Sequence, residues 1–233
     1  MIESVAVIGA RGRVGAAVTA RLVERRVDLR RPDDPTVDIV LLCVPDRAIG
    51  EVAAATPEGP WIGHVSGATP LSSLAPHLRR FSLHPLQTFT HERGAEQLDG
   101  AFAAVTADDG PGLGVATRLA ELLGLTPFAL ADEARPAYHA AAVMAANYLV
   151  TLHRAAGLLM TRAGAPPEAL DPLVRRVQDN GFALTGPIDR GDWETVERNR
   201  AAIHERAPEL EEAYVVLADL TARLAGIRRE VSA

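Results

Sequence analysis

The chain has 233 residues, of which 48% are hydrophobic, and this length and composition exclude an intrinsically disordered protein. The net charge of −6 argues against a nucleic-acid-binding surface, and no apolar stretch reaches the roughly 20 residues needed to span a bilayer. The only cysteine, Cys43, cannot form an internal disulfide, and the first residues lack a signal-peptide pattern. We therefore expect a cytoplasmic protein.

Apolar runs alternate with helix-like segments through the first half of the chain. A strand predicted over residues 5–8 leads into a glycine turn, and a helix follows. Residues 38–44 are apolar on both faces of a strand, which is typical of the centre of a parallel sheet. Further strands are predicted at residues 61–65, 81–83, 101–106 and 126–129, with a helix at 114–123. This alternation predicts an α/β fold with a doubly wound parallel sheet of the Rossmann type.

No strand signal follows Asp132 and Glu133. The rest of the chain shows only helical patterns, at residues 135–163, 167–180, 192–205 and 208–224, and Asp192 is placed to cap the third of these helices. We therefore expect two domains. A Rossmann-type dinucleotide-binding domain would cover residues 1–131, and an all-helical domain would cover residues 132–233.

The turn after the first strand has the pattern Gly-x-x-Gly-x-x-Gly. Such a turn lets backbone N–H groups approach a pyrophosphate at the positive end of the following helix. The alternative is a tight strand–helix turn that binds nothing. We expect a cofactor, NADP or NAD, to contact a set of residues in this turn and after the central strand: Gly9, Arg11, Gly12, Arg13, Val14, Gly15, Val44 and Pro45.

The segment that is expected to contact the cofactor's ribose is charged. Asp28 suits a free ribose hydroxyl, whereas Arg30 and Arg31 suit the 2′-phosphate of NADP; the alternative is a solvated loop. Only residues 31–37 separate this segment from the next strand, although a complete βαβ unit takes about 30 residues. We therefore expect the sheet to be truncated on the adenine side, with weak or lost cofactor binding.

Polar residues follow the predicted strands where ligands bind in open α/β sheets. His84 is the candidate acid or base, because histidine titrates near neutrality; alternatively it anchors its loop. Ser66 would orient a substrate oxygen or cap a short helix. Gln87 and Thr88 would bind a substrate carboxylate or close their loop.

The helical half adds three candidate residues. His139 and Asn147 lie on one broad face of an apolar helix and would contact substrate or bond across a helix interface. Arg190 would bind a substrate carboxylate or an acidic residue of a partner subunit. The histidines of the first half have no metal-ligand spacing, so no metal site is expected.

Several strings together resemble one family. They are the turn from Gly9 to Gly15, Val44-Pro45-Asp46, His64-Val65-Ser66-Gly67, residues 81–89, Tyr138-His139-Ala140-Ala141-Ala142 with Asn147, and residues 184–192. The chain resembles Rossmann-like proteins whose C-terminal half is the domain of unknown function numbered 2520. These proteins belong to the 6-phosphogluconate-dehydrogenase-like superfamily, and some resemble ketopantoate reductases.

The resemblance implies an NAD(P)-dependent oxidoreductase with a cleft between its domains and a helical domain that forms a homodimer. His84-Pro85 is also similar to the histidine-proline of prephenate dehydrogenases, in which the histidine meets the substrate hydroxyl. The chain departs from the family pattern on the cofactor side. The extra residue Arg11 lengthens the turn, and the stretch before Asp38 is short. The chain also has no lysine, although hydroxyacid dehydrogenases of the superfamily use a catalytic one.

Two functions follow from these features. In the first, the protein reduces a small carbonyl compound that carries a carboxylate: His84 donates the proton, and Asn147, Arg190 and the loop residues hold the substrate. In the second, the protein is a non-catalytic nucleotide-binding or assembly module with a degenerate cofactor site. Binding of NADPH or NADH separates the two.

Overall fold

The structure, a computed structural model, describes residues 2–227. The chain divides after Ala146 into two compact units, of which the first is α/β and the second is helical. The last strand ends at Ala129, close to the expected boundary at residue 131. The first compact unit nevertheless continues through the next helix, because Arg135 and Tyr138 of that helix bond to the sheet.

The first unit is built on a seven-stranded sheet with the order β2-β1-β3-β4-β5-β6-β7. The strands are β1 (Ser4–Ile8), β2 (Asp28–Leu29), β3 (Ile39–Leu42), β4 (Trp61–His64), β5 (Arg80–Pro85), β6 (Phe102–Ala107) and β7 (Thr126–Ala129). Each strand foreseen in the sequence is present, and the Rossmann-like α/β class is confirmed. The expectation of a wholly parallel sheet is wrong at one place, because β5 and β6 pair antiparallel.

The connection between β5 and β6 explains this exception. Residues 86–101 contain only a short 3₁₀ turn, Ala95–Leu98, and no α-helix that would carry the chain back along the sheet. The backbone N–H of Leu86 instead donates to the carbonyl of Phe102 at 2.8 Å, which begins the antiparallel pairing. Helix α3 (Gly110–Leu122) then provides the crossover that makes β6 and β7 parallel.

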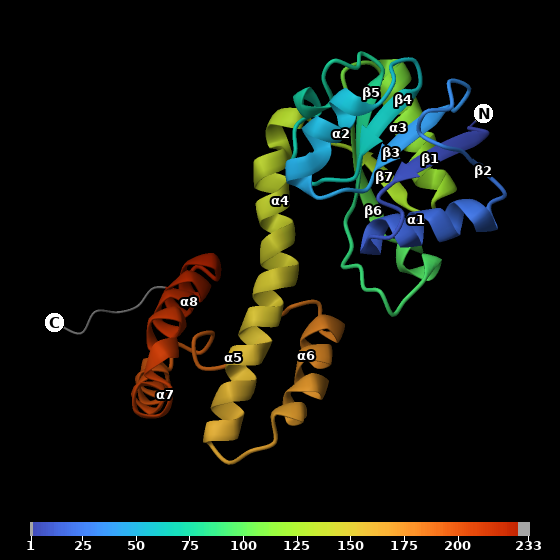
Figure 1. Cartoon of the computed structure of the whole chain (residues 1–233). Helices are drawn as coiled ribbons and strands as arrows, with labels where there is room; N and C mark the ends of the chain where they lie inside the picture. The colour runs from blue at the N-terminus through green and yellow to red at the C-terminus, as the bar shows by residue number, and fades with distance from the viewer. Residues whose placement is uncertain (1, 228–233) are drawn as a thin grey trace. The chain divides into compact units, whose positions relative to one another are not determined.

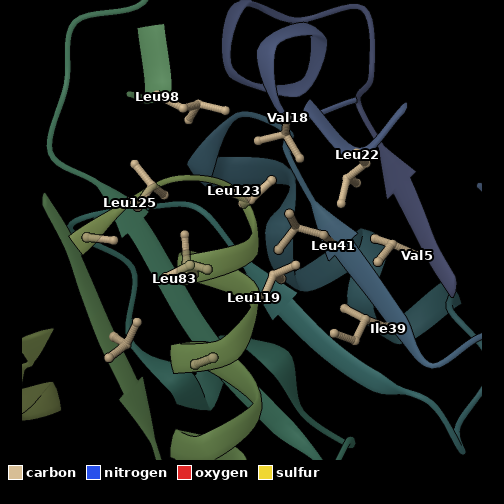
Figure 2. Close-up of a cluster of buried hydrophobic side chains, with 14 of the residues drawn as sticks. Val5, Val18, Leu22, Ile39, Leu41, Leu83, Leu98, Leu119, Leu123 and Leu125 are labelled. Carbon is tan, nitrogen blue, oxygen red and sulfur yellow. The ribbon is translucent and has the colours of Figure 1, made fainter. Parts of the chain in front are cut away.

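Helices cover both faces of the sheet (Figure 1). Helices α1 (Arg13–Glu24) and α3 pack on one face, and α2 (Ile49–Ala55) with the 3₁₀ turn Leu71–Leu74 packs on the other. Figure 2 shows the larger core, in which side chains of α1 and α3 meet those of the strands. Strand β3 contributes to both cores, since Ile39 and Leu41 face one and Val40 and Leu42 the other. This confirms β3 as a central strand.

The sheet ends at β2, which has two residues and pairs only with β1. The chain then passes to β3, on the other side of β1, without an intervening helix. Asp38 fixes the start of β3, because its carboxylate accepts the backbone N–H groups of Glu3 and Ser4 at 2.8 and 3.0 Å. The expected truncation on this side of the sheet is thus present in the topology.

The remaining helices also follow the sequence pattern. Helix α4 (Arg135–Val143) continues through a π-helical turn, Met144–Tyr148, into α5 (Leu149–Arg162). The others are α6 (Leu170–Asp179), α7 (Trp193–Arg206) and α8 (Glu211–Leu224). As expected, Asp192 caps α7 by accepting the N–H of Thr195 at 3.1 Å. Within residues 2–227, no helix combines the length and the apolar character needed to cross a membrane.

Candidate active site

The parallel strands β1, β3, β4 and β5 bring their carboxyl ends to one edge of the sheet. Gly9 follows β1, Val44 and Pro45 follow β3, Ser66 follows β4, and His84 lies at the end of β5. Ligands of open α/β sheets bind at this edge. The first unit therefore gathers the glycine turn and the polar candidates of the sequence where a ligand site is expected.

The glycine turn packs closely against the end of β3. A Cβ at Gly9 would lie 2.3 Å from the carbonyl oxygen of Cys43, and Gly9 has a φ of +92°, which favours glycine. A Cβ at Gly15 would lie 2.2 Å from the carbonyl oxygen of Gly9. A Cβ at Gly12 would come no nearer than 3.3 Å to this oxygen. Packing thus demands glycine at positions 9 and 15 and demands it much less at position 12.

The N-terminus of α1 is open to an anion. Its N-cap, Gly12, supplies no side-chain cap, and the first turn holds no acidic residue. The first N–H groups of a helix lack partners within the helix and carry partial positive charge. Arg11 and Arg13 flank the turn and are exposed. Val14 is partly buried, as is Val44, whose Cγ1 lies 3.3 Å from the Cβ position of Gly9; Pro45 is exposed.

Arg30, expected to contact the cofactor's ribose or its phosphate, bonds within its own loop. Its Nε donates to Asp28 at 2.7 Å, and its Nη1 donates to the hydroxyl of Thr36 and lies 3.8 Å from Asp34. These contacts match the alternative of a charged surface loop. They also occupy Asp28, the residue that suits a free ribose, so the loop does not distinguish NAD from NADP.

His84 forms a close pair with Tyr138. The Nδ1 atom of His84 lies 2.7 Å from the hydroxyl oxygen of Tyr138, and the two rings meet edge to face with centroids 5.5 Å apart. On its other side the imidazole lies against Gly67, where an added Cβ would come within 2.9 Å of Nε2. The ring of His139 is 6.4 Å away. The structure therefore brings together His84 and His139, and it adds Tyr138 and Gly67.

The sequence-based reason for assigning His84 as an acid or base needs correction. The pKa of His84 is not near neutrality, because burial lowers it to about 4, and the neighbouring His139 and Arg135 act in the same direction. Asp46 has the opposite, smaller effect. Burial also raises the pKa of Tyr138 to about 12. Near pH 7, the pair therefore consists of a neutral imidazole and a neutral phenol.

Arg135 fixes the helix that carries Tyr138. Its side chain is 1% exposed and donates to Asp132, to the backbone carbonyl of Ser66 and to the hydroxyl of Ser82. Residues three apart share one face of a helix, so Tyr138 projects to the same side as Arg135. Neither Arg135 nor Tyr138 is predicted as a site residue from the sequence. A polar set at positions 135, 138 and 139 of an otherwise apolar helix is the signal by which they could have been found.

Ser66 and His64 form a second polar pair beside His84. The hydroxyl of Ser66 donates to Asp46 at 2.8 Å and accepts the N–H groups of Ala68 and Thr69. Ser66 thus closes a local turn and does not cap the following 3₁₀ helix Leu71–Leu74, whose N-cap is Pro70 without a side-chain cap. His64 is fully buried and accepts the N–H of Ser66 at Nδ1, whereas Nε2 has no partner within residues 2–227. Burial lowers the pKa of His64 to about 4.

The other candidate residues have local partners or lie elsewhere. Gln87 closes its loop, since its amide donates to the carbonyl of Gln97 at 3.2 Å and its oxygen accepts the N–H of Thr88 at 2.8 Å. Thr88 is exposed. Asn147 and Arg190 belong to the helical unit and are both exposed. Their roles in binding substrate remain predictions.

A cavity of about 400 Å³ lies at the opposite edge of the sheet, near the amino ends of β3 and β4. Trp61, Arg79 and Arg118 line part of it, and the guanidinium of Arg79 lies 4.9 Å from the centre of the Trp61 ring. None of the candidate residues lines this cavity. Across residues 2–227, no three His, Cys, Asp or Glu side chains are grouped so that they could hold a metal ion.

A family model described as Domain of unknown function (DUF2520) matches residues 101–221, slightly more than half of the chain. The chain belongs to the DUF2520 family. This confirms the resemblance found in the sequence. The matched region begins before β6 and ends within α8, so it contains Tyr138, His139, Asn147 and Arg190 but not the glycine turn or His84. No curated protein matches the chain.

Solved structures share the fold of this DUF2520 protein over nearly its whole length. Protein TM1727 from Thermotoga maritima is 25% identical, with 96% of this chain and 98% of that chain covered and a TM-score of 0.76. BF3122 from Bacteroides fragilis, described as a putative NADP oxidoreductase, is 17% identical, with 94% and 98% covered and a TM-score of 0.76. A semialdehyde dehydrogenase NAD-binding protein from Cupriavidus necator, in complex with calcium and NAD, is 18% identical, with 92% and 99% covered and a TM-score of 0.63.

Proposed function

We propose that this DUF2520 protein is an NAD(P)-dependent oxidoreductase that acts on a small carbonyl compound or hydroxy acid. The observation that carries the proposal is the glycine turn, which packs tightly at Gly9 and Gly15 and leaves the N-terminus of α1 uncapped. A pyrophosphate fits such a helix end. The names of two structural relatives, one an NADP oxidoreductase and the other a complex with NAD, support the same cofactor class.

The residues of the turn fit a dinucleotide. The backbone N–H groups at positions 13–15 would hold the pyrophosphate, and the exposed Arg11 and Arg13 would add positive charge. A bound nicotinamide ring would supply or accept a hydride beside Val44 and Pro45, where the neighbouring strands end. His84 lies at the same edge of the sheet and would hold or move the proton that accompanies the hydride.

The proposed substrate class follows from His84, the acid–base candidate at the end of β5. A substrate hydroxyl or carbonyl would meet His84, as expected for a hydroxy acid or carbonyl compound related to ketopantoate. Ser66 and Gln87 bond to neighbouring groups, so we assign them the task of shaping the loops beside the substrate. Thr88 is exposed and remains available for a direct contact.

One observation favours the alternative of a non-catalytic module. The sheet ends at the two-residue strand β2, and Arg30 and Asp28 bond to each other there. A dinucleotide has little surface to contact on this side, so its adenosine half would gain less binding energy than in a full Rossmann sheet. This alternative predicts that the protein binds neither NADH nor NADPH.

The deciding experiment is a titration of the purified protein with NADPH and with NADH, followed by cofactor fluorescence. Micromolar, saturable binding is expected. Gly12→Ala should weaken it at least tenfold, because the new methyl group occupies the approach to the N-terminus of α1. Gly110→Ala is the matched control, since Gly110 begins α3 and has open space around its Cβ position. Absence of binding at millimolar cofactor would overturn the proposal.

We further propose that the protein is a homodimer that assembles through its helical unit. Few apolar side chains of this unit are buried, namely Val196, Ile203, Ala207, Ala218 and Ala222 among the described residues. Large apolar side chains are instead exposed along α5 and its start, namely Tyr148, Leu149, Val150, Leu152 and Leu158. Exposed apolar surface of this extent is typical of a protein interface, and two-fold pairing lets the same surface serve both copies.

A further inference from the structure

The two ring nitrogens of His84 have different surroundings. Nδ1 is paired with the hydroxyl of Tyr138 at 2.7 Å. Nε2 has no hydrogen-bond partner within residues 2–227, and this atom is not fully buried. It lies beside Gly67, where any Cβ would approach to 2.9 Å. Nε2 is therefore the nitrogen that a substrate can reach, and glycine at position 67 keeps the space beside it open.

The position of the hydrogen between His84 and Tyr138 follows from acidity. A phenol is a stronger acid than the N–H of a neutral imidazole, and an imidazole nitrogen is a stronger base than a phenolic oxygen. The hydroxyl of Tyr138 therefore donates to Nδ1. A neutral imidazole carries one proton, so this bond places that proton on Nε2.

We propose, as an extension of the proposed function, that Tyr138 is a positioning residue that fixes His84 with its proton on Nε2 and replaces that proton through Nδ1 during the reaction. As the carbonyl carbon gains a hydride, the electron pair of the C–O π bond forms an O–H bond with the Nε2 proton, and the N–H bond breaks. The O–H bond of Tyr138 breaks as the new Nδ1–H bond forms. The imidazole stays neutral, and solvent reprotonates the resulting phenolate.

The charges around the pair support this relay. His84 is faced by Tyr138 and His139 from α4, by Arg135 at the start of α4, and by Asp46 after β3. Because burial lowers the pKa of His84 to about 4, an imidazolium is scarce near pH 7 and cannot be the ordinary donor. Burial raises the pKa of Tyr138 to about 12, which still leaves the phenol more acidic than a substrate alcohol. Tyr138 can therefore supply the proton that a neutral imidazole passes on.

The first test needs neither substrate nor cofactor. Nitrogen chemical shifts of ¹⁵N-histidine-labelled protein report which ring nitrogen is protonated, and His84→Gln identifies the signals of His84. The wild type is expected to show a protonated Nε2 and an unprotonated Nδ1. Tyr138→Phe should give a mixture of tautomers, and Tyr214→Phe, in α8, should leave the signals unchanged. A wild type with its proton on Nδ1, or a Tyr138→Phe protein with an unchanged tautomer, would overturn the proposal.

The second test measures turnover with NADPH and a set of 2-keto acids. Tyr138→Phe should lower kcat about 100-fold, the lower range for loss of acid–base catalysis, and leave the Kd of NADPH unchanged. Unchanged kcat in this variant would contradict the relay. Failure of the wild type to bind NADPH would contradict the proposed function instead, whereas the tautomer of His84 decides the role of Tyr138 independently.

Discussion

Arg135 and Asp132 form an ion pair of 2.6 Å at the point where the chain leaves the sheet and enters α4. The guanidinium is 1% exposed, and Asp132 also accepts the backbone N–H of Leu71 at 3.1 Å. Further bonds join Arg135 to Ser66 and Ser82. The helix that carries Tyr138 and His139 is thus fixed to the sheet by a buried charge, whose removal would leave several polar groups without a partner.

Replacing Arg135 should destabilise the first unit. Arg135→Met leaves the carboxylate of Asp132 with only the N–H of Leu71 and removes the donor to the hydroxyl of Ser82. Loss of one partner of a buried pair costs about 3 kcal/mol of unfolding free energy. Urea unfolding measures the change. The same variant should weaken the His84–Tyr138 pair, because its helix is no longer fixed. Arg175→Met on the exposed surface of α6 is the control, and equal stability of the two variants would show that the buried bonds are not important for stability.

Substitutions of Gly15 and Gly12 in the glycine turn should lower the stability of the protein by different amounts. Gly15→Ala places a methyl group 2.2 Å from the carbonyl oxygen of Gly9, so the turn must shift, and overpacking of this kind costs about 1–3 kcal/mol. In Gly12→Ala the new methyl group lies 3.3 Å from the same oxygen, so the free energy of unfolding should fall by about 1 kcal/mol or less. Thermal unfolding of both variants checks the order. A Gly12→Ala protein less stable than Gly15→Ala would contradict the packing described for the turn.

Much of the first unit is predictable from local pattern. The β1 strand, the glycine turn and α1 follow each other with the expected spacing, and residues 39–42 are apolar on both faces, so they occupy the centre of the sheet. The direction of β6 is not predictable in this way. Its hydrophobic pattern is the same for either direction, and the direction depends on the connection after β5.

The candidate site is less predictable, because its chemistry arises from contacts between distant residues. His84 stands out in the sequence as the end of a strand, but its low pKa depends on burial and on His139 and Arg135, more than 50 positions away. The sequence shows Tyr138 only as one residue of an apolar helix. Its hydroxyl lies 2.7 Å from Nδ1 of His84 because the fold brings the helix against the end of β5. Arg30 suits a phosphate by type, yet it bonds within its own loop.

The helical unit should control the oligomeric state. Leu149→Asp and Leu152→Asp together place two charges on the exposed apolar side of α5, and burying unpaired charges in an interface is strongly unfavourable. Light scattering after size exclusion should show a dimer for the wild type and a monomer for the double variant. Ala201→Asp and Ala202→Asp, at exposed positions of α7, provide a control of equal charge change that should remain dimeric. A monomeric wild type at micromolar concentration would contradict the proposed assembly.

The buried histidines should make the protein sensitive to mild acid. The pKa of His64 is about 4 in the folded chain against an ordinary value of 6.5, so between these values the unfolded chain binds more protons. The contribution of the neutral His64 imidazole to the free energy of unfolding is therefore at its full value above about pH 6.5, and it declines as the pH falls toward 4. For His64 the loss between pH 7.5 and pH 5 is about 2 kcal/mol, and His84 acts in the same direction.

Urea unfolding at pH 7.5 and pH 5 measures this loss, and His64→Asn tests its origin. The asparagine oxygen can still accept the N–H of Ser66, as Nδ1 of His64 does at 3.2 Å, but it takes up no proton. The difference in stability between the two pH values should shrink by about 2 kcal/mol in this variant, even if the variant is less stable at both. His91→Asn changes an exposed histidine and should keep the wild-type difference. If His64→Asn also keeps it, the acid sensitivity does not come from burial of a neutral imidazole at position 64.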